Sequence, residues 1–270
     1  TTLDLSHNQL SGEIPSEIGN LIHLESLDLS ENEFSGEIPP EIGSFIYLED
    51  LDLSGNELSG EIPPEIGSLI HLENLRLNFN QLTNIPREIE NLINVEKIFL
   101  YNNNLSNEIP IELYNLNKLK VLSISNNALT GTISNSIDNL ISLERLYLNN
   151  NQLTGVIPYE IGNLNNLNSL NLSNNELSGE IISEIGNLIS LNNIYLNDNQ
   201  LTGVIPSELG NLIYLEHLDL SENELSGIMS PEICNLGASS PLFGNNQLCP
   251  PYPSCISEND IESQNTSNCD

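Results

Sequence analysis

Leucines alternate with polar residues in short runs that recur along almost the whole chain. In residues 26–30, for example, Leu27 and Leu29 alternate with serine and aspartate, and this period of two predicts a half-buried β-strand. An asparagine follows each run, three residues after its last apolar residue: Asn8, Asn32, Asn56, Asn80, Asn103, Asn127, Asn151, Asn175, Asn199 and Asn223. Successive asparagines are 24 residues apart, except for 23 residues between Asn80 and Asn103. The chain is therefore a tandem repeat, in which ten units fill residues 1 to about 236.

The remainder of each unit predicts how the chain turns back. The side-chain amide of Asn32 can both donate and accept, so stacked asparagines can satisfy the backbone groups of successive turns. Gly36 suits a left-handed turn, and the residues after Ile38 and Pro39 suit a short helical or irregular stretch on the far side. One such unit cannot bury its own apolar face, whereas a stack of them can. We therefore expect one parallel sheet, which lies on the concave side because the far-side segments are wider than the strands.

The repeat unit also carries a family resemblance. Its pattern, Leu-x-x-Leu-x-Leu-x-x-Asn-x-Leu-Ser/Thr-Gly-x-Ile-Pro-x-x-Ile-Gly-Asn-Leu, has good copies at residues 167–187 and 215–227 and resembles the plant-specific class of extracellular leucine-rich repeats. The resemblance implies an α/β-type repeat solenoid, a curved right-handed superhelix with a parallel β-sheet on its concave face. Short second strands and 3-10 or short helical turns would form its convex side. Since such repeats occur in receptor-like protein ectodomains and polygalacturonase-inhibiting proteins, the resemblance implies a secreted or cell-surface recognition module and not an enzyme.

The N-terminal end of the chain lacks a feature of this family. Residue 1 already lies inside a repeat, and the cysteine-bearing N-terminal cap of the family is absent. Terminal coils need a polar outer face, so we expect processing, truncation or a missing upstream region. The resulting expectation for domains is a solenoid over residues 1–236, a C-terminal cap over 237–256 and an acidic, flexible tail over 257–270.

The C-terminal end contains all four cysteines. Residues 243–255 are similar to the closing cap of plant-type repeats, in which Leu-Cys is followed by prolines and a second cysteine. That similarity implies a disulfide between Cys249 and Cys255, which leaves Cys234 with Cys269. The sequence by itself allows three pairings of four cysteines and does not choose among them.

The charge of the chain narrows the range of partners. Its 270 residues include 38 Asp+Glu and 6 Lys+Arg, which gives a formal net charge of −32. A surface this acidic argues against nucleic acid, which binds through Lys and Arg, and against anionic membranes. No apolar run is long enough for a membrane-spanning helix. All six bases lie between Arg76 and Arg145, so the acidic charge is unevenly distributed.

Outward-facing positions on the predicted sheet flank each Leu-x-Leu, because alternate side chains of a strand point the same way. In and beyond repeats 4 to 7 these positions gather aromatic and basic side chains, which are enriched at binding hot spots. We expect a partner-binding surface there, formed by Arg76, Phe79, Lys97, Phe99, Tyr101, Arg145, Tyr147 and Tyr195. Its partner would be a protein or peptide, and the acidic repeats on either side would attract a cationic one. The alternative is that the bases only relieve repulsion within a long acidic stack.

Columns of polar residues leave other functions open. Asp28, Asp50 and Asp52 crowd one patch, and calcium would relieve their repulsion, although no Asp-x-Asp-x-Asp-Gly loop is present. No other cofactor is expected. A hydroxyl column could bind ice or a polysaccharide: Ser11, Ser35, Ser59, Thr83, Ser106, Thr130, Thr154, Ser178, Thr202 and Ser226. An adhesive or structural spacer is a third possibility.

Catalysis has little support in the sequence. His217, Asp219 and Ser221 would share one strand face, but a catalytic triad needs the histidine between the other two residues. A flat strand also offers no oxyanion hole. We therefore expect no catalytic residues.

Overall fold

The computed structural model describes residues 1–238, 240–261 and 263–269. The chain falls into two compact units, Thr1–Thr130 and Gly131–Asp270, and each is a stack of similar coils. A coil contributes one strand to a parallel sheet, continues in many cases through a second short strand, and closes with a 3-10 helix, labelled η. Within the described residues, no helix has the length and apolar character needed to cross a bilayer.

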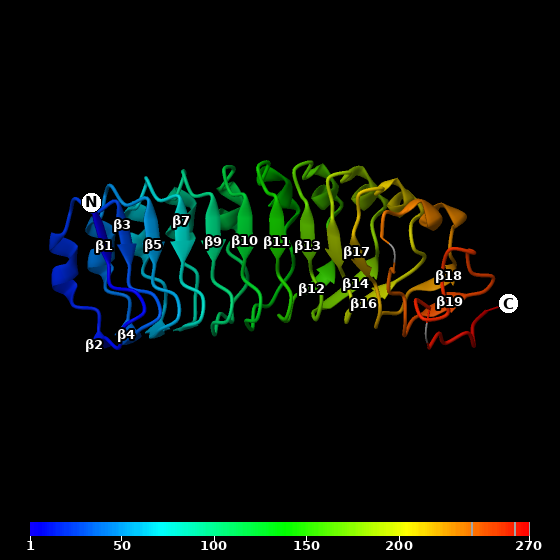
Figure 1. Cartoon of the computed structure of the whole chain (residues 1–270), viewed down its shortest axis with the longest axis horizontal. Coiled ribbons are helices and arrows are strands. Elements are labelled where there is room, and N and C mark those ends of the chain that lie inside the picture. The colour runs from blue at the N-terminus through cyan, green and yellow to red at the C-terminus, as the bar shows by residue number, and fades with distance from the viewer. Residues whose placement is uncertain (239, 262, 270) are drawn as a thin grey trace. The chain divides into compact units, whose positions relative to one another are not determined.

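The first unit, all of whose residues are described, has parallel sheet strands that lie side by side (Figure 1). They are β1 (Thr2–Asp4), β3 (Ser26–Asp28), β5 (Asp50–Asp52), β7 (Asn74–Arg76), β9 (Lys97–Phe99) and β10 (Val121–Ser123). A second parallel sheet joins β2 (Ser11–Glu13), β4 (Glu33–Glu37), β6 (Glu57–Gly60) and β8 (Gln81–Leu82). The 3-10 helices are η1 (Ser16–Asn20), η2 (Pro40–Ser44), η3 (Pro64–Ser68), η4 (Arg87–Asn91) and η5 (Ile111–Asn115).

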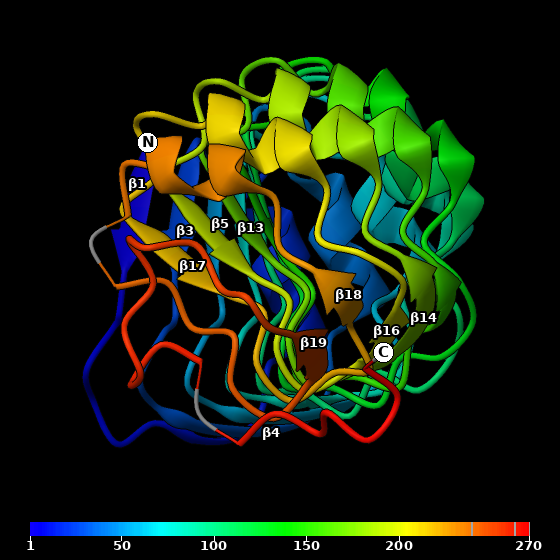
Figure 2. The same ribbon diagram turned by 90° about the vertical axis from the view of Figure 1, so that its right-hand side faces the viewer.

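The second unit repeats this arrangement. Its main sheet contains β11 (Arg145–Tyr147), β13 (Ser169–Asn171), β15 (Asn193–Tyr195) and β17 (His217–Asp219). Its short strands are β12 (Thr154–Val156), β14 (Glu176–Glu180), β16 (Gln200–Thr202), β18 (Ser226–Ile228) and β19 (Gln247–Cys249). Its 3-10 helices are η6 (Asn135–Asn139), η7 (Tyr159–Asn163), η8 (Ser183–Asn187), η9 (Ser207–Asn211) and η10 (Pro231–Asn235). Figure 2 shows that the sheet, the helices and the short strands of this unit occupy different sides of its coils.

The core of each unit contains the apolar positions that the alternating pattern predicted. Leu51, Leu53 and Leu75 are fully buried in the first unit, as are Leu170 and Leu172 in the second. The isoleucines of the 3-10 helices close the core from the opposite side, with Ile42, Ile66, Ile161 and Ile185 also fully buried. The solenoid predicted from the repeat is therefore confirmed.

A ladder of asparagines connects successive coils, as the repeat predicted. The side-chain nitrogen of Asn32 donates to the carbonyls of Leu5, Leu29 and Ser30 at 2.9, 3.2 and 3.1 Å. Its side-chain oxygen accepts from the backbone nitrogen of Leu10 at 3.0 Å. One amide thus satisfies backbone groups of its own coil and of the preceding one, which keeps the coils in register.

The backbone is left-handed at the residue before each ladder asparagine, a feature that the repeat pattern did not predict. The φ angle there is 54° at Glu31, 55° at Phe79 and 54° at Glu222. The glycine of the second turn is left-handed as expected, with φ of 77° at Gly60. A Cβ added to Gly60 would lie 2.9 Å from Cγ of Glu37, so the glycine also makes room for a side chain of the preceding coil.

The disulfide pairing differs from the one that the family resemblance implied. Cys234 pairs with Cys255 and Cys249 with Cys269, so the predicted Cys249–Cys255 and Cys234–Cys269 bonds are wrong. Cys249 ends β19, which pairs with β18, and Cys255 bonds instead to Cys234 of η10. The chain later returns to the cap, which brings Cys269 to Cys249.

The described residues of the acidic segment 257–270 pack against the cap. The backbone carbonyl of Asp260 accepts from the nitrogen of Phe243 at 2.8 Å, and the nitrogen of Asn265 donates to the carbonyl of Asn246 at 2.8 Å. The side-chain oxygen of Gln264 accepts from the nitrogen of Leu248 at 2.9 Å. These contacts explain why Cys269 lies within reach of Cys249. The division into solenoid, cap and tail stays a prediction.

Candidate functional site

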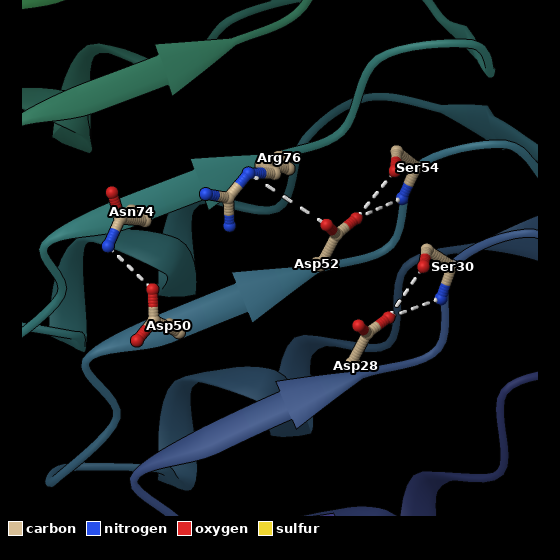
Figure 3. A network of polar contacts seen from close by, with 7 residues as sticks. All are labelled: Asp28, Ser30, Asp50, Asp52, Ser54, Asn74 and Arg76. Carbon is tan, nitrogen blue, oxygen red and sulfur yellow. Dashed lines mark hydrogen bonds and ion pairs between the residues drawn. The ribbon is translucent and has the colours of Figure 1, made fainter. Parts of the chain in front are cut away.

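The outward-facing side chains of the first unit's sheet change character along the stack. Asp4, Asp28, Asp52, Arg76 and Phe99 stand in one register across β1, β3, β5, β7 and β9. An acidic stretch therefore borders the base and the first aromatic ring on a continuous sheet face. Figure 3 shows the middle of this column, where a dashed line joins Arg76 to Asp52 on the neighbouring strand.

Serines stabilise the carboxylates of this acidic stretch. Asp28 accepts hydrogen bonds from the nitrogen and the hydroxyl of Ser30 at 2.9 and 2.6 Å, and Asp52 accepts the same two from Ser54 at 3.0 and 2.6 Å (Figure 3). Arg76 Nε lies 3.9 Å from Asp52. The pKa of Asp4 is lowered below its usual value, mainly by a hydrogen bond from the hydroxyl of Ser6 and secondarily by one from the backbone nitrogen of Ser6.

The calcium site considered for this patch receives no support from geometry. Among the described residues, no group of three or more His, Cys, Asp or Glu side chains is placed to hold a metal ion. Asp50 accepts instead from the side-chain nitrogen of Asn74 on the next strand (Figure 3). The acidic stretch is thus a series of carboxylates, each with its own donor.

Four of the predicted partner-binding residues form a connected cluster on the first unit, here called the aromatic patch: Arg76, Phe79, Phe99 and Tyr101. The guanidinium carbon of Arg76 lies 5.8 Å from the ring centroid of Phe99, which is cation–π geometry. Phe99 and Tyr101 meet edge to face at 6.4 Å, and Phe79 and Tyr101 do so at 5.2 Å. Lys97 stands on the same strand as Phe99, in register with Asn74.

Phe79 occupies an unusual backbone position for its size. Its φ of 55° is left-handed, which bulky residues rarely adopt. The equivalent positions in other coils hold small or polar residues, among them Gly55, Asn102 and Asn126. The ring is nevertheless 50% exposed, so burial in this unit offsets little of the strain.

Three other basic residues of the first unit interact with acidic or amide side chains outside the aromatic patch. Lys120 forms an ion pair with Glu96 at 2.7 Å, and Arg87 forms one with Glu88 at 3.1 Å. Lys118 donates to the side-chain oxygen of Asn94 at 2.7 Å. The ion pairs of Lys120 and Arg87 therefore agree with the alternative that the bases only relieve repulsion among acidic residues. Arg76 differs, because it contacts both an acid and an aromatic ring.

The other predicted site residues lie on the second unit. Arg145 and Tyr147 stand on β11, and Tyr195 stands on β15 in the same register as Tyr147, with Asn171 of β13 between them. Tyr195 stacks on His217 at 6.4 Å with an interplanar angle of 19°. The prediction missed His217 as a site residue, although its outward position next to the tyrosine column could have indicated it.

The triad-like residues on β17 make structural contacts instead. Ser221 donates to Asp219 through its hydroxyl at 2.6 Å and its backbone nitrogen at 3.0 Å. This is the same arrangement as Asp28 with Ser30, whereas the ring of His217 stacks on Tyr195. The three residues therefore do not line up as a proton relay.

The hydroxyl column is partly engaged by the backbone. Thr83 donates to the carbonyl of Gly60 at 3.0 Å, and Thr154 donates to that of Gly131 at 3.2 Å. Ser59 and Ser178 make the same contact at 3.4 Å with Gly36 and Gly155. These hydroxyls donate their protons to the preceding coil, so toward solvent they can act only as hydrogen-bond acceptors.

Comparison with known protein families identifies the type of repeat in this chain. Residues 2–146 match the family described as "Leucine-rich repeat region", and residues 117–177, 190–212 and 214–236 match families described as leucine rich repeats. The chain belongs to the leucine-rich repeat family. No curated protein matches it.

Among solved structures, this leucine-rich repeat chain resembles plant receptor ectodomains. The plant peptide hormone receptor RGFR1, in complex with RGF2, is 39% identical with a TM-score of 0.88, over 93% of this chain and 41% of that chain. The leucine-rich repeat ectodomain of the Arabidopsis thaliana membrane receptor kinase GASSHO1/SCHENGEN3, in complex with CASPARIAN STRIP INTEGRITY FACTOR 2, is 39% identical with a TM-score of 0.87, over 91% and 30%. The chain thus spans less than half the length of these receptors.

A plant protein of a different function is also similar. A plant ice-binding protein is 29% identical with a TM-score of 0.77, and the match covers 94% of this chain and 83% of that chain. The leucine-rich repeat coil therefore carries more than one kind of recognition. The choice between them depends on the outward side chains and not on the fold.

Proposed function

We propose that this leucine-rich repeat chain is an extracellular recognition module, secreted or at the cell surface, which binds a peptide across the sheet of its first unit. The similarity to the ectodomains of RGFR1 and GASSHO1 supports this proposal. The two disulfides support an oxidising compartment, because such bonds persist there. The module would act by binding and not by catalysis.

The observation that carries the proposal is Phe79. A residue with a Cβ in the left-handed region loses about 1–2 kcal/mol relative to the ordinary helical region. Its ring supports Tyr101 edge to face, and Tyr101 in turn meets Phe99, which lies under Arg76. Strained residues persist where function requires them, and aromatic and arginine side chains dominate binding energy. A bound partner would supply the burial that Phe79 lacks in the free protein.

The neighbouring acidic stretch indicates the chemistry of the peptide. Asp28 and Asp52 would attract a basic side chain, while Phe99 and Tyr101 would accept an apolar one. Strands of a sheet are about 4.8 Å apart, so β3 and β9 are separated by about 14 Å across three intervals. An extended peptide advances about 3.4 Å per residue. The basic residue would therefore lie about four residues from the apolar one.

The sheet of the second unit offers a further contact surface of its own. Arg145 is exposed, and Tyr147 and Tyr195 are half-buried on its outward face. These are again residue types that are enriched at interfaces. In our proposal they contact a longer peptide or a protein partner, while the aromatic patch is the principal anchor.

A peptide-display experiment tests this function. A phage-displayed random peptide library is selected on the immobilised full chain, and the recovered peptides are titrated against variants by calorimetry. We expect peptides that combine a basic and an apolar residue at the spacing given above. The double variant Phe99→Ala/Tyr101→Ala should weaken them about tenfold or more, because it removes two of the patch's rings.

Tyr47 provides the matched control. It is 50% exposed in the same unit, away from the aromatic patch, where it stacks between His23 and His71. Tyr47→Ala should leave the affinity unchanged. Equal losses in both variants, or no loss in the double variant, would show that the aromatic patch is not the anchor.

Ice binding is a second candidate, which the similarity to the plant ice-binding protein favours. The hydroxyl column would provide regularly spaced oxygen acceptors, since its protons are used within the stack at Thr83 and Thr154. Thermal hysteresis of the purified chain measures this function directly. A hysteresis gap that disappears in the double variant Thr83→Val/Thr154→Val would favour ice binding, and the absence of any gap would exclude it.

A further inference from the structure

Glycines let successive 3-10 helices of the second unit pack closely. A Cβ added to Gly162 of η7 would lie 2.4 Å from the Cβ of Glu184 in η8. A Cβ added to Gly186 of η8 would lie 2.4 Å from the carbonyl oxygen of Glu208 in η9. These helices therefore have no space for a side chain at this position.

Asp138 interrupts the series. It occupies the same position in η6, and η7 packs less closely on η6 than η8 packs on η7. A polar hollow of about 340 Å³ lies at this point, lined in part by Asn135, Asp138, Glu160 and Asn163. The side-chain nitrogen of Asn163 donates to the carboxylate of Asp138 at 3.3 Å, so both groups are aimed into the same space.

Tyr159 is a second departure from the repeat, and it lies at the same place. It begins η7, where the neighbouring helices η6 and η8 begin with Asn135 and Ser183, and it is 62% exposed. Its side chain lines the polar hollow and also a second hollow of about 640 Å³, which is mostly apolar and includes Val156 and Ile182. An exposed aromatic ring thus separates an apolar hollow from one lined by amides and carboxylates.

We propose that Tyr159 and its two hollows form a binding site for a neutral oligosaccharide. A sugar ring has an apolar face of C–H groups and a rim of hydroxyls. The ring of Tyr159 suits the face, and the side chains of Asn135, Asp138 and Glu160 suit the rim, since amides and carboxylates accept from hydroxyls. The volumes of both hollows fall within the range of about 300–1,000 Å³ of small-molecule sites, and both are shallow and open to solvent, so they suit an extended chain of sugars and not an enclosed ligand. This site is separate from the aromatic patch of the proposed peptide-binding function.

The charges around Tyr159 select against acidic sugars. A hydrogen bond to the carboxylate of Glu160, and then the negative charges of Glu160, Asp138 and Glu184, raise the pKa of Tyr159 above its usual value. The tyrosine hydroxyl therefore stays protonated at neutral pH, and the carboxylates nearby repel an anionic ligand. A saccharide that carries uronic acids is disfavoured for this reason.

Titration with defined oligosaccharides tests the proposal. Cellohexaose, xylohexaose and tetragalacturonate are each added to the full chain, and binding is followed by saturation-transfer difference NMR and calorimetry. We expect at least one of the two neutral oligosaccharides to bind and tetragalacturonate not to bind. Tyr159→Ala should weaken the neutral ligand about tenfold, the upper range for loss of one aromatic contact. Binding of neither neutral oligosaccharide would overturn the proposal, as would equal affinity for tetragalacturonate.

Two further variants separate a site from a surface effect. Asp138→Gly restores the glycine of the repeat and lets η7 pack more closely on η6, as η8 packs on η7. It should therefore weaken oligosaccharide binding without lowering the melting temperature. Tyr214→Ala removes a tyrosine that is equally exposed, at 65%, but lines neither hollow, so the affinity should not change. A loss in Tyr214→Ala as large as in Tyr159→Ala would contradict the site. Phe99→Ala, which lies in the first unit, should not affect sugar binding, so failure here leaves the peptide proposal standing.

Discussion

The two units have the same coil but present different side chains beside their short strands. The outward positions hold Glu13, Glu37 and Glu61 in the first unit, whereas the second unit has Val156, Val204 and Ile228 at three equivalents and keeps a glutamate, Glu180, at another. The backbone beneath is nearly identical, because Gly60 and Gly227 both have φ of 77° and both lie against the outward side chain of the preceding coil. Inward residues and turn residues therefore decide the fold, and the outward columns are free to differ in chemistry.

The sheet faces show how charge can change without a change in structure. In the first unit, Asp28 accepts from the nitrogen and hydroxyl of Ser30 at 2.9 and 2.6 Å. In the second unit, Asn171 accepts the same two hydrogen bonds from Ser173 at 3.1 and 2.7 Å. An aspartate and an asparagine are thus interchangeable for local bonding but differ by one negative charge. This exchange lets one unit carry an acidic face while the other carries tyrosines on a less charged one.

The largest effect should come from positions that both units share. In the first unit, Asn80 donates to the carbonyls of Leu53 and Leu77 and accepts from the nitrogen of Leu58. We expect Asn80→Ala to lower the free energy of unfolding by about 2–4 kcal/mol, because it leaves several buried backbone groups unpaired. Urea-induced unfolding followed by circular dichroism measures the loss.

Asn223 is the equivalent of Asn80 in the second unit and allows the two units to be compared directly. It donates to the carbonyls of Leu196 and Leu220 and accepts from the nitrogen of Leu201 with nearly the same distances. Asn223→Ala should therefore lower stability by the same amount within about 1 kcal/mol. A loss confined to one of the two variants would mean that the units do not rely on the ladder equally.

A smaller effect of opposite sign should distinguish the units at the left-handed turn. Phe79→Asn replaces a strained phenylalanine with the residue type found at the equivalent Asn174. Asparagine tolerates this conformation, so we expect a gain of about 1 kcal/mol in the free energy of unfolding. Peptide binding should fall in the same variant, because Tyr101 loses its edge-to-face partner.

The reciprocal change, Asn174→Phe, tests the strain in the second unit. It should lower stability by about 1 kcal/mol, because phenylalanine is strained in the left-handed region. The affinity for the selected peptides should not change, since their proposed anchor, the aromatic patch, lies in the first unit. Thermal unfolding of both variants gives the comparison. If Phe79→Asn were destabilising, the ring would be part of the fold, and the argument that it is kept for recognition would fail.

The period of the sequence was sufficient to predict the solenoid, for a physical reason. The burial seen at Leu27 and Leu29 and the turn hydrogen bonds seen at Asn32 recur in the coils that follow, so the same residue pattern has the same structural consequence along the stack. The resemblance to plant receptor ectodomains followed from the same pattern and is confirmed. Arg76, Phe79, Phe99 and Tyr101 are in contact with one another within one unit, but their role in partner binding stays a prediction.

Features that arise between coils could not be predicted in this way. The disulfide pairing depends on how the C-terminal segment folds back, so that Asp260 accepts a hydrogen bond from Phe243. The repeat pattern does not specify this path. The hollow beside Tyr159 depends on a single aspartate at a position where the next helix approaches closely. Such departures from the repeat are visible in the sequence as irregularities, but their consequences require the neighbouring coil.

The smallest effect should come from exchanging the outward columns themselves. Glu37→Val places the second unit's residue type in the first unit, and Val204→Glu does the reverse. Both side chains lie beside the glycine of the next coil, because a Cβ added to Gly60 would lie 2.9 Å from Cγ of Glu37 and one added to Gly227 would lie 3.0 Å from Cγ1 of Val204. Either residue type can therefore fill the space. Each exchange should therefore change the free energy of unfolding by about 0.5 kcal/mol or less, as surface substitutions usually do. A loss of more than about 2 kcal/mol in either variant would show that these columns belong to the structural part of the coil, and the separation between fold-determining and function-determining positions would then not hold.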